Sequence, residues 1–357
     1  MTFFRYGLIA AAFLALPAAA TTVRVHYDAG KDSIAIRGDK GPMSWAKGAP
    51  AAKSDVSNVW TYTWPDELGE VTMKPTLGAD KVSTGGTYKL AVGSTVDIYP
   101  FFGAPFGKVT IVQKFESPQL HNSRALRIYL PPSYEENKAK RYPVLYMHDG
   151  QNLFDAKTAA YGVEWGIDET VNHLIATGAM DEVIVVGIDN TPDRIPEYTP
   201  CCDPKYGGGK LDAYEAFVVD TVKPYVDKTL RTLAGKENTA IMGSSLGGIA
   251  SVYIAQRHPE VFSKAGGVSS AFWWNKGEMI ARPPARVPVK FYIDAGTKND
   301  DIDDTSKMRD AMVKQGYKLD ADLYYYAAEG GSHNEKSWAA RVDKPLLWFF
   351  PWGSTRY

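Results

Sequence analysis

The chain has 357 residues, of which 45% are hydrophobic, and its 40 lysines and arginines nearly balance its 41 aspartates and glutamates. This apolar content is enough to build the core of one large domain or of two ordinary ones. The balanced charge gives no indication of the basic surface with which proteins bind nucleic acid or anionic membranes, so neither is expected as a partner.

The N-terminal residues 1–20 have the pattern of an export signal. Arg5 is followed by an almost uncharged run from Tyr6 to Leu16 and then by the small residues of Pro17-Ala-Ala-Ala20. We expect cleavage after Ala20. The alternative is an uncleaved anchor, but the apolar run is shorter than the about 20 residues of a membrane-spanning helix. The mature protein is therefore expected in the periplasm or outside the cell, with no membrane partner after signal cleavage.

Residues 21–105 are expected to form a small all-β sandwich. Short runs of alternating apolar and polar residues follow one another, separated by Gly, Pro, Asp and Ser, which is typical of such domains. The runs cover residues 22–27, 33–37, 59–64, 70–74, 87–92 and 95–99. Trp60 and Trp64 have strand spacing and are expected in the core. Trp45 lies in a polar loop and is the better candidate for stacking on a sugar ring.

From residue 106 to residue 357 the pattern changes to alternating strands and helices. Strands are expected at 109–113, 124–130, 143–147, 182–187, 239–242, 264–268, 289–293 and 323–326, the first two antiparallel. Helices are expected at 164–177, 212–230, 249–255, 306–315 and 335–350. Apolar strands that alternate with helices indicate a mostly parallel sheet covered on both faces, and ligands bind at the carboxyl ends of its strands.

The stretch Gly243-Ser-Ser-Leu-Gly247 has a G-x-S-x-G pattern between an apolar strand and a helix. A chain that turns from strand to helix in so few residues is strained at the serine, and the flanking glycines remove Cβ atoms that would clash. The hydroxyl is then held clear of the sheet, at the positive end of the next helix. We therefore predict that Ser245 is a nucleophile, although the pentapeptide alone also fits an ordinary glycine-rich turn.

A serine nucleophile needs a base within hydrogen-bond reach. Two histidines follow Ser245 in the chain. His258 lies at the end of a predicted helix and is expected to be structural. His333 lies in a glycine-rich loop after the last strand, where the base of an α/β-hydrolase is found, and we predict that His333 is the base.

The base needs an acid that orients it, and the acid should follow the strand before the last one. The loop 294–304 contains five aspartates at that place. Asp300 and Asp301 lie at its tip. We choose Asp300 as the acid and keep Asp301 as the close alternative.

The oxyanion of the tetrahedral intermediate needs backbone N–H donors. One is expected from Leu246, the residue after the nucleophile, and one from Gln151 or Gly150 in the loop after the third strand. His148 and Asp149 adjoin this loop, but two residues are too few to ligate a metal. Neither a metal nor another cofactor is expected.

Cys201 and Cys202 are the only cysteines, and they are adjacent. In an oxidising compartment they can form a vicinal disulfide that stiffens one loop. The alternative is a pair of thiols, and the sequence leaves both open.

Four motifs together resemble the putative-esterase family of α/β-hydrolases, which includes feruloyl and acetylxylan esterases, enterochelin esterases and S-formylglutathione hydrolases. The motifs are His148-Asp-Gly-Gln-Asn-Leu-Phe-Asp155, Arg194-Ile-Pro-Glu-Tyr-Thr-Pro200, Gly243-Ser-Ser-Leu-Gly-Gly248 and Phe291-Tyr-Ile-Asp-Ala-Gly-Thr-Lys298. The resemblance covers residues 108–350 and implies an α/β-hydrolase fold with Ser245 as nucleophile and His333 as base. It does not choose the acid, because some relatives have a carboxylate at the position of Asn299 and some work with a Ser–His dyad.

Other family-like positions suggest contacts with a substrate. Trp273 resembles an aromatic residue near the acyl site, and core packing is the alternative. Arg194 and Tyr198 follow a strand and are candidates for holding the substrate, with a structural ion pair as the alternative for Arg194. The N-terminal strands and the loop 37–45 resemble starch-binding-type carbohydrate modules.

These observations together predict an exported serine carboxylesterase. It is expected to act on carbohydrate-linked esters, such as acetyl or feruloyl esters, through an acyl-enzyme. An enterochelin-type siderophore esterase is the first alternative. A glycan-binding protein with an inert hydrolase domain is the second, and the full set of catalytic residue types argues against it.

Overall fold

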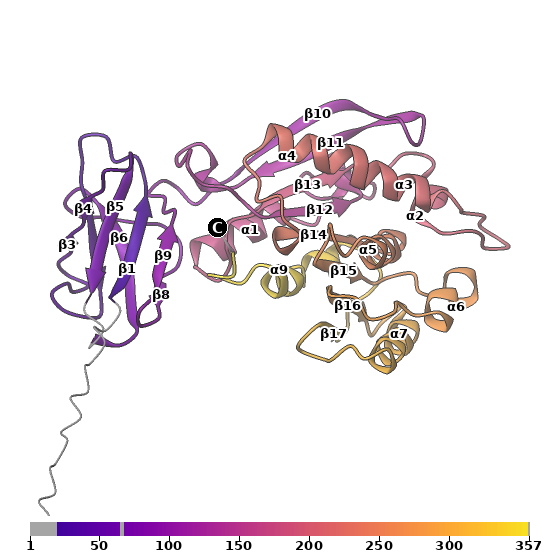
Figure 1. The fold of residues 1–357 in the computed structure, drawn as a ribbon. Helices are drawn as coiled ribbons and strands as arrows, with labels where there is room; N and C mark the ends of the chain where they lie inside the picture. The colour runs from indigo at the N-terminus through magenta and orange to yellow at the C-terminus, as the bar shows by residue number, and fades with distance from the viewer. Residues whose placement is uncertain (1–19, 65–67, 356–357) are drawn as a thin grey trace, which may run out of the picture. The chain divides into compact units, whose positions relative to one another are not determined.

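The computed structural model describes residues 20–64 and 68–355. They form two compact units (Figure 1), of which the first holds the described residues up to Val82 and Thr87–Tyr99, and the second holds Ser83–Gly86 and the described residues from Pro100 onward. The expected signal, residues 1–20, lies outside the described residues except for Ala20 and stays a prediction. Within the described ranges, no helix has the length and apolar character needed to cross a membrane.

The first unit is the expected all-β sandwich. Its strands are β1 (Thr21–His26), β2 (Ile34–Gly38), β3 (Ala49–Pro50), β4 (Ala52–Lys53), β5 (Val59–Trp64), β6 (Val71–Leu77), β7 (Lys81–Val82), β8 (Tyr88–Leu90) and β9 (Thr95–Ile98). One sheet has the order β4-β5-β1-β9, and the other has the order β3-β2-β6-β7 with β8 paired to β6. Trp60 and Trp64 are buried in the core, whereas Trp45 is 47% exposed.

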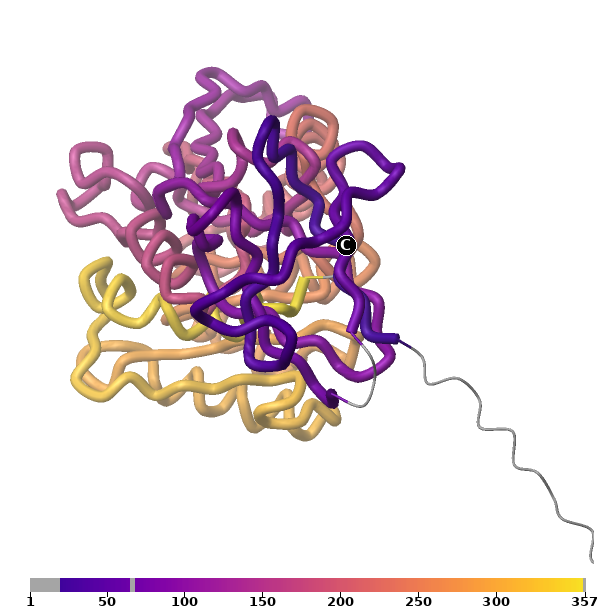
Figure 2. The backbone as a smooth tube through the Cα atoms, turned by 90° about the vertical axis from the view of Figure 1, so that its left-hand side faces the viewer, coloured from indigo at the N-terminus to yellow at the C-terminus, as the bar shows by residue number. Residues whose placement is uncertain are grey.

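The second unit is built on one eight-stranded sheet. Its strands are β10 (Lys108–Ser117), β11 (Asn122–Leu130), β12 (Val144–His148), β13 (Ile184–Ile188), β14 (Thr239–Ser244), β15 (Lys264–Val268), β16 (Lys290–Gly296) and β17 (Leu323–Ala328). The order is β10-β11-β13-β12-β14-β15-β16-β17. β11 pairs antiparallel with both of its neighbours, and the remaining pairs are parallel. Figure 2 accordingly shows the late segments, orange to yellow, together at one end of this unit.

Helices cover both faces of this sheet. They are α1 (Ile167–Ala176), α2 (Arg194–Tyr198), α3 (Leu211–Phe217), α4 (Lys223–Thr229), α5 (Leu246–Arg257), α6 (Trp274–Ala281), α7 (Ile302–Lys314), α8 (Glu335–Ala339) and α9 (Asp343–Phe349). Successive residues of β12 point to opposite faces, so Tyr146 packs in the core with α3, α5 and α7, and Met147 packs in the core with α1 and α9. The predicted α/β-hydrolase class is confirmed.

One of the two long predicted helices is continuous and the other is divided. The helix expected at 212–230 runs without a break through α3, a π-helical turn, η4 (Val218–Val222), and α4, which has Pro224 in its first turn. The helix expected at 335–350 is divided into α8 and α9, and Pro345 lies in the first turn of α9. Proline has no N–H for the helical ladder, but the first turn of a helix needs none, which favours a new start there.

Candidate active site

Ser245 lies at the turn between β14 and α5, on a strand in the interior of the sheet. Its φ of 55° and ψ of −120° are unfavourable for a residue with a side chain. The flanking glycine makes this turn possible, because a Cβ atom on Gly243 would lie 2.8 Å from the ring of His148 and 2.9 Å from the backbone of Gly247. The geometry is therefore the strained strand–turn–helix connection that the sequence predicts, with Ser245 at the N-terminal end of α5.

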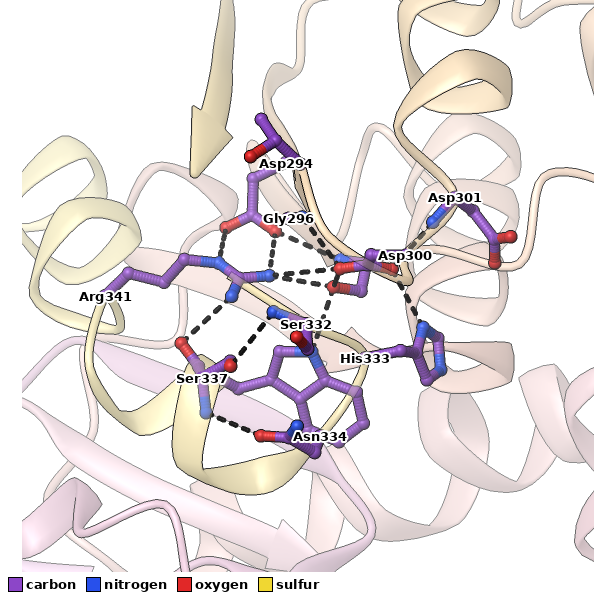
Figure 3. A network of polar contacts seen from close by, with 12 residues as sticks. Asp294, Gly296, Asp300, Asp301, Ser332, His333, Asn334, Ser337 and Arg341 are labelled. Carbon is purple, nitrogen blue, oxygen red and sulfur yellow. Dashed lines mark hydrogen bonds and ion pairs between the residues drawn. The ribbon is translucent and has the colours of Figure 1, made fainter. Parts of the chain in front are cut away.

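His333 and Asp300 meet beyond the ends of the neighbouring strands β16 and β17 (Figure 3). Nδ1 of His333 lies 2.9 Å from Oδ1 of Asp300. The Asp300 side chain is fully buried, and the His333 side chain is 31% exposed. The buried carboxylate thus orients an imidazole that still reaches solvent.

The Asp300 carboxylate accepts hydrogen bonds on both oxygens. Oδ1 accepts from His333 and from the backbone N–H of Asp301, at 2.8 Å, and Oδ2 accepts from the N–H of Gly296, at 2.7 Å, and from the hydroxyl of Ser269. Burial opposes ionisation, but these hydrogen bonds outweigh it and lower the pKa of Asp300. An ionised carboxylate only accepts, so Nδ1 of His333 is the donor, and in the neutral imidazole the lone pair is then on Nε2.

Asp301, the alternative acid, has a different environment. It is the N-cap residue of α7, and its carboxylate accepts a hydrogen bond from Nε1 of Trp273 at 3.1 Å. Its pKa is raised, mainly by burial. The described contacts therefore place Asp300, and not Asp301, against Nδ1 of His333.

Ser245 and His333 line the same cavity, which has a volume of about 570 Å³. Arg194 and Lys336 contribute charged groups to its wall, and Tyr161 contributes an aromatic ring that is 79% exposed. Ser245 and His333 also border a smaller hollow of about 290 Å³ whose lining includes Trp273, Asp300 and Asp301. The predicted nucleophile and base thus share one solvent-accessible site at the carboxyl edge of the sheet.

The sequence model of an esterase family described as "Putative esterase" matches residues 117–349. The chain belongs to this family. It is therefore a carboxylic ester hydrolase, and its putative-esterase region corresponds to the second unit with the eight-stranded sheet.

Relatives of this esterase carry names of known activities. The chain is 28% identical over 240 residues to an endo-1,4-beta-xylanase/feruloyl esterase of Xylanibacter ruminicola, a match that covers 64% of this chain and only 30% of that protein. A ferulic acid esterase of Anaeromyces mucronatus has a similar fold, with a TM-score of 0.54, 19% identity and coverage of 70% of this chain and 92% of that one. The enterobactin esterase of Shigella flexneri has a TM-score of 0.53 and 14% identity, and the similarity covers 92% of both chains.

The backbone N–H groups predicted to bind the oxyanion belong to residues near the turn at Ser245. Leu246 begins α5 directly after Ser245. Gly150 and Gln151 lie in a 3₁₀ turn, η3 (Gly150–Asn152), where Gly150 packs against β13 and the Gln151 side chain accepts a hydrogen bond from the N–H of Asn190 at 3.1 Å. The cavity wall itself contains their neighbours Asp149 and Asn152. The role of Leu246, Gly150 and Gln151 as donors stays a prediction.

Arg194 and Tyr198 lie on the same short helix, α2, but in different environments. Arg194 lines the cavity and donates from Nε and Nη2 to the buried carboxylate of Asp149, at 2.7 and 2.8 Å. Tyr198 is fully buried, and its hydroxyl accepts a hydrogen bond from the backbone N–H of Asp149. The prediction that Tyr198 contacts the substrate is therefore wrong for this conformation, because the ring packs beneath Arg194 against His148.

Cys201 and Cys202 form a vicinal disulfide, one of the two alternatives that the sequence left open. Their loop packs against the tryptophans that follow β15. Nε1 of Trp274 donates to the carbonyl of Pro200 at 3.3 Å, and the ring of Tyr206 lies 5.8 Å from that of Trp273. The disulfide loop therefore supports the wall that Trp273 forms beside Ser245.

Two groups of acidic and imidazole side chains in the described ranges have metal-like spacing. In the first, Asp300, Asp301 and His333, the Asp300 oxygens are already occupied by the donors described above. The second consists of Glu164, Asp168 and Glu169 at the start of α1. Burial, together with the hydrogen bond and charge of Glu169, raises the pKa of Asp168 to about 7, which is typical of carboxyls that share a proton.

Sequence reasoning missed several residues that surround the acid. Ser269, Trp338 and Arg341 all contact the Asp300 network, and Tyr161 lies on the cavity wall. No motif marks them, because each reaches the site from a different loop or helix. The one local sign of a site residue is a position directly after a parallel strand, and among these residues only Ser269, after β15, has it.

Proposed function

We propose that this esterase hydrolyses its substrate with Ser245, His333 and Asp300. Oγ of Ser245 attacks the ester carbonyl carbon while Nε2 of His333 takes its proton, and the tetrahedral intermediate expels the alcohol, which takes that proton back from His333. Water then attacks the acyl-enzyme while His333 takes its proton, and His333 returns this proton to Oγ of Ser245 as the carboxylic acid is released. The observation that carries the proposal is the 2.9 Å contact between His333 and the buried Asp300 beside the cavity that Ser245 also lines.

We further propose that the substrate is a carbohydrate-linked ester, with an acetyl or feruloyl acyl group. The names of the Xylanibacter and Anaeromyces relatives support this choice. The exposed ring of Tyr161 on the cavity wall offers a face on which an aromatic acyl group can stack. Trp45 in the β-sandwich is the candidate sugar contact of the first unit.

A siderophore ester is the second candidate, and a specific observation favours it. The structural similarity to the Shigella flexneri enterobactin esterase covers 92% of both chains, so it includes the β-sandwich as well as the esterase unit. The similarity to the Anaeromyces mucronatus enzyme covers 70% of this chain. The two substrate classes differ enough to be separated by direct assay.

The deciding experiment compares the wild type with Ser245→Ala on p-nitrophenyl acetate, methyl ferulate and enterobactin. We expect the wild type to hydrolyse p-nitrophenyl acetate and methyl ferulate, and the variant to lose at least about 10³-fold in kcat. Equal rates for the two proteins would remove Ser245 as the nucleophile. A wild type that prefers enterobactin would favour the siderophore candidate.

Binding and export can be tested on the full chain. If the β-sandwich binds sugar, the wild type should be retained on insoluble xylan or starch and Trp45→Ala should be retained less. Equal retention of the two proteins would argue against Trp45, and retention of neither would argue against the module. For export, N-terminal sequencing of the mature protein from a periplasmic fraction should begin at Thr21.

A further inference from the structure

Ser269 connects the Asp300 carboxylate to two other side chains. Its Oγ lies 2.7 Å from Nη2 of Arg341 and 2.9 Å from Nε1 of Trp338, and both of these groups can only donate. The two contacts occupy both lone pairs of the hydroxyl oxygen. The single hydroxyl proton must therefore point to Oδ2 of Asp300, which lies 2.5 Å away.

Arg341 is held in place by a second buried carboxylate. It is 3% exposed, and it donates from Nε and Nη2 to Asp294 at 2.9 and 3.0 Å (Figure 3). Asp294, within β16, is itself fully buried and also accepts from the N–H of Ser269. Nη2 of Arg341 lies 3.8 Å from Oδ2 of Asp300, so one guanidinium faces both carboxylates.

The same segment of chain carries the base and these supporting groups. His333 is followed by α8, which contains Trp338, and then by Arg341. The Trp338 ring lies edge-on to the imidazole with centroids 5.2 Å apart, and Nη1 of Arg341 donates to the carbonyl of Ser337 at 2.9 Å. A shift of this segment would therefore move the base and the support of the acid together.

We propose that Ser269 and Arg341 are positioning residues for ester hydrolysis, which together hold Asp300 so that Oδ1 accepts the Nδ1 proton of His333. The inference rests on the proposed function of Ser245, His333 and Asp300. Neither residue touches the substrate cavity, so both act through Asp300. Four donors saturate the carboxylate, and rotation about its Cβ–Cγ bond would disturb their hydrogen bonds.

The charges around Asp300 agree with this arrangement. The groups that face it are His333 from the loop after β17, Arg341 from the turn after α8, and Asp301 from the start of α7, while Asp294 on β16 partly neutralises Arg341. Burial opposes ionisation of Asp300, and the hydrogen bonds, including that from Ser269, lower its pKa below the ordinary value. Removal of the Ser269 hydroxyl should raise this pKa again.

The test uses Ser269→Ala in the full chain, with Ser270→Ala as the matched control. Ser270 is the adjacent serine and is equally buried, but its hydroxyl has no hydrogen-bond partner among the described residues. We expect Ser269→Ala to lower kcat about tenfold, as for the loss of a hydrogen bond to a charged group, with KM within about twofold. The Asp300 carboxyl should titrate at a higher pH in Ser269→Ala than in the wild type, as NMR of its carboxyl carbon would show, because the carboxylate has lost one of its donors. Ser270→Ala should change none of these.

Arg341 is tested with two variants, because its removal leaves Asp294 buried and unpaired. Arg341→Lys keeps the charge but not the forked contact, and the pair Asp294→Asn with Arg341→Met removes both charges. We expect a lowered kcat in both, and an Asp300 carboxyl that titrates at a higher pH in the charge-free pair.

The outcomes separate this inference from the proposed function. If Ser245→Ala is inactive and Ser269→Ala matches Ser270→Ala in kcat, KM and the Asp300 titration, the positioning role of Ser269 is overturned. If the variant with both Asp294→Asn and Arg341→Met has wild-type kinetics, the positioning role of Arg341 is overturned. If Ser245→Ala keeps the wild-type rate, the proposed function itself fails, and the positioning roles for that reaction fail with it.

Discussion

Oδ1 of Asp300 and Nδ1 of His333 lie 2.9 Å apart, although 33 residues separate them in the chain. The parallel pairing of β16 and β17 brings their two loops to the same edge of the sheet. The carboxylate is buried and the imidazole is partly open to the cavity. A buried carboxylate behind a partly exposed imidazole fixes the orientation of the ring without blocking access to Nε2.

This relationship predicts different effects for two neighbouring aspartates. Asp300→Asn should lower kcat by about 10³- to 10⁴-fold, because an amide can donate to Nδ1 and favour the wrong tautomer of His333. Asp301→Asn should stay within about tenfold, because its carboxylate accepts from Trp273 and is not the partner of Nδ1. Steady-state kinetics on p-nitrophenyl acetate check both. Similar losses for the two variants, or none for Asp300→Asn, would contradict the assignment.

The tight turn between β14 and α5 predicts that position 243 accepts only glycine. In Gly243→Ala the new methyl group would meet the backbone of Gly247 at 2.9 Å, and a backbone cannot rotate away. We expect the free energy of unfolding to fall by about 1–3 kcal/mol and kcat to fall with it, because Ser245 is displaced. Urea unfolding and kinetics measure the two effects. If the free energy of unfolding and kcat are both unchanged in Gly243→Ala, the turn can relax and the prediction is wrong.

The ion pair between Arg194 and Asp149 allows the structural role of Arg194 to be separated from a substrate contact. Arg194→Met leaves a buried carboxylate without its cation, which should cost about 3 kcal/mol of stability. The double variant Asp149→Asn with Arg194→Met should recover part of this loss. If KM is raised in Arg194→Met and remains raised in the double variant, Arg194 also binds the substrate. If KM recovers with stability, its role is structural.

His148 predicts a loss of stability in mild acid. Burial lowers the pKa of His148 from 6.5 to about 4, so between these values the unfolded chain binds more protons than the native one. Stability therefore falls as pH drops from 6.5 toward 4, by up to roughly 3 kcal/mol from this group. In His148→Gln this part of the pH dependence should disappear. Urea unfolding at several pH values measures the slope, and an unchanged slope would assign it to other groups.

Asp168 predicts the opposite sense of pH dependence. Its pKa is raised to about 7, so the native state binds the extra proton and stability falls as pH rises from about 4 to 7. Asp168→Asn should therefore be more stable than the wild type above pH 7, on the order of 1 kcal/mol after allowance for solvent screening. Thermal unfolding at pH 5 and pH 8 measures the difference. If the difference in stability between Asp168→Asn and the wild type is the same at both pH values, Asp168 does not hold the extra proton.

Much of the esterase unit could be predicted from short stretches of sequence. The apolar strands and the interposed helices indicate the parallel sheet, because burial on both faces requires strands that are apolar throughout. The helix at 335–350 was predicted too long, because apolar spacing continues across residues 340–342, where the structure has a turn between α8 and α9.

In the site, some features depend on adjacent residues and others depend on residues that are distant in the chain. The turn at Ser245 depends on the backbone conformation of a few adjacent residues, so the G-x-S-x-G pattern alone predicts it. The choice of Asp300 over Asp301 depends on which carboxylate Ser269, Gly296 and His333 reach, and those donors lie on other elements.

The sequence by itself therefore determined the fold class, the strained serine turn and the histidine loop that follows the last strand. Only the tertiary structure decided that Tyr198 is buried beneath Arg194 and that Ser269 and Arg341 support Asp300. The physical reason is that backbone strain and apolar periodicity are local properties of the chain. Burial and hydrogen-bond partners depend on residues that meet only when the sheet assembles.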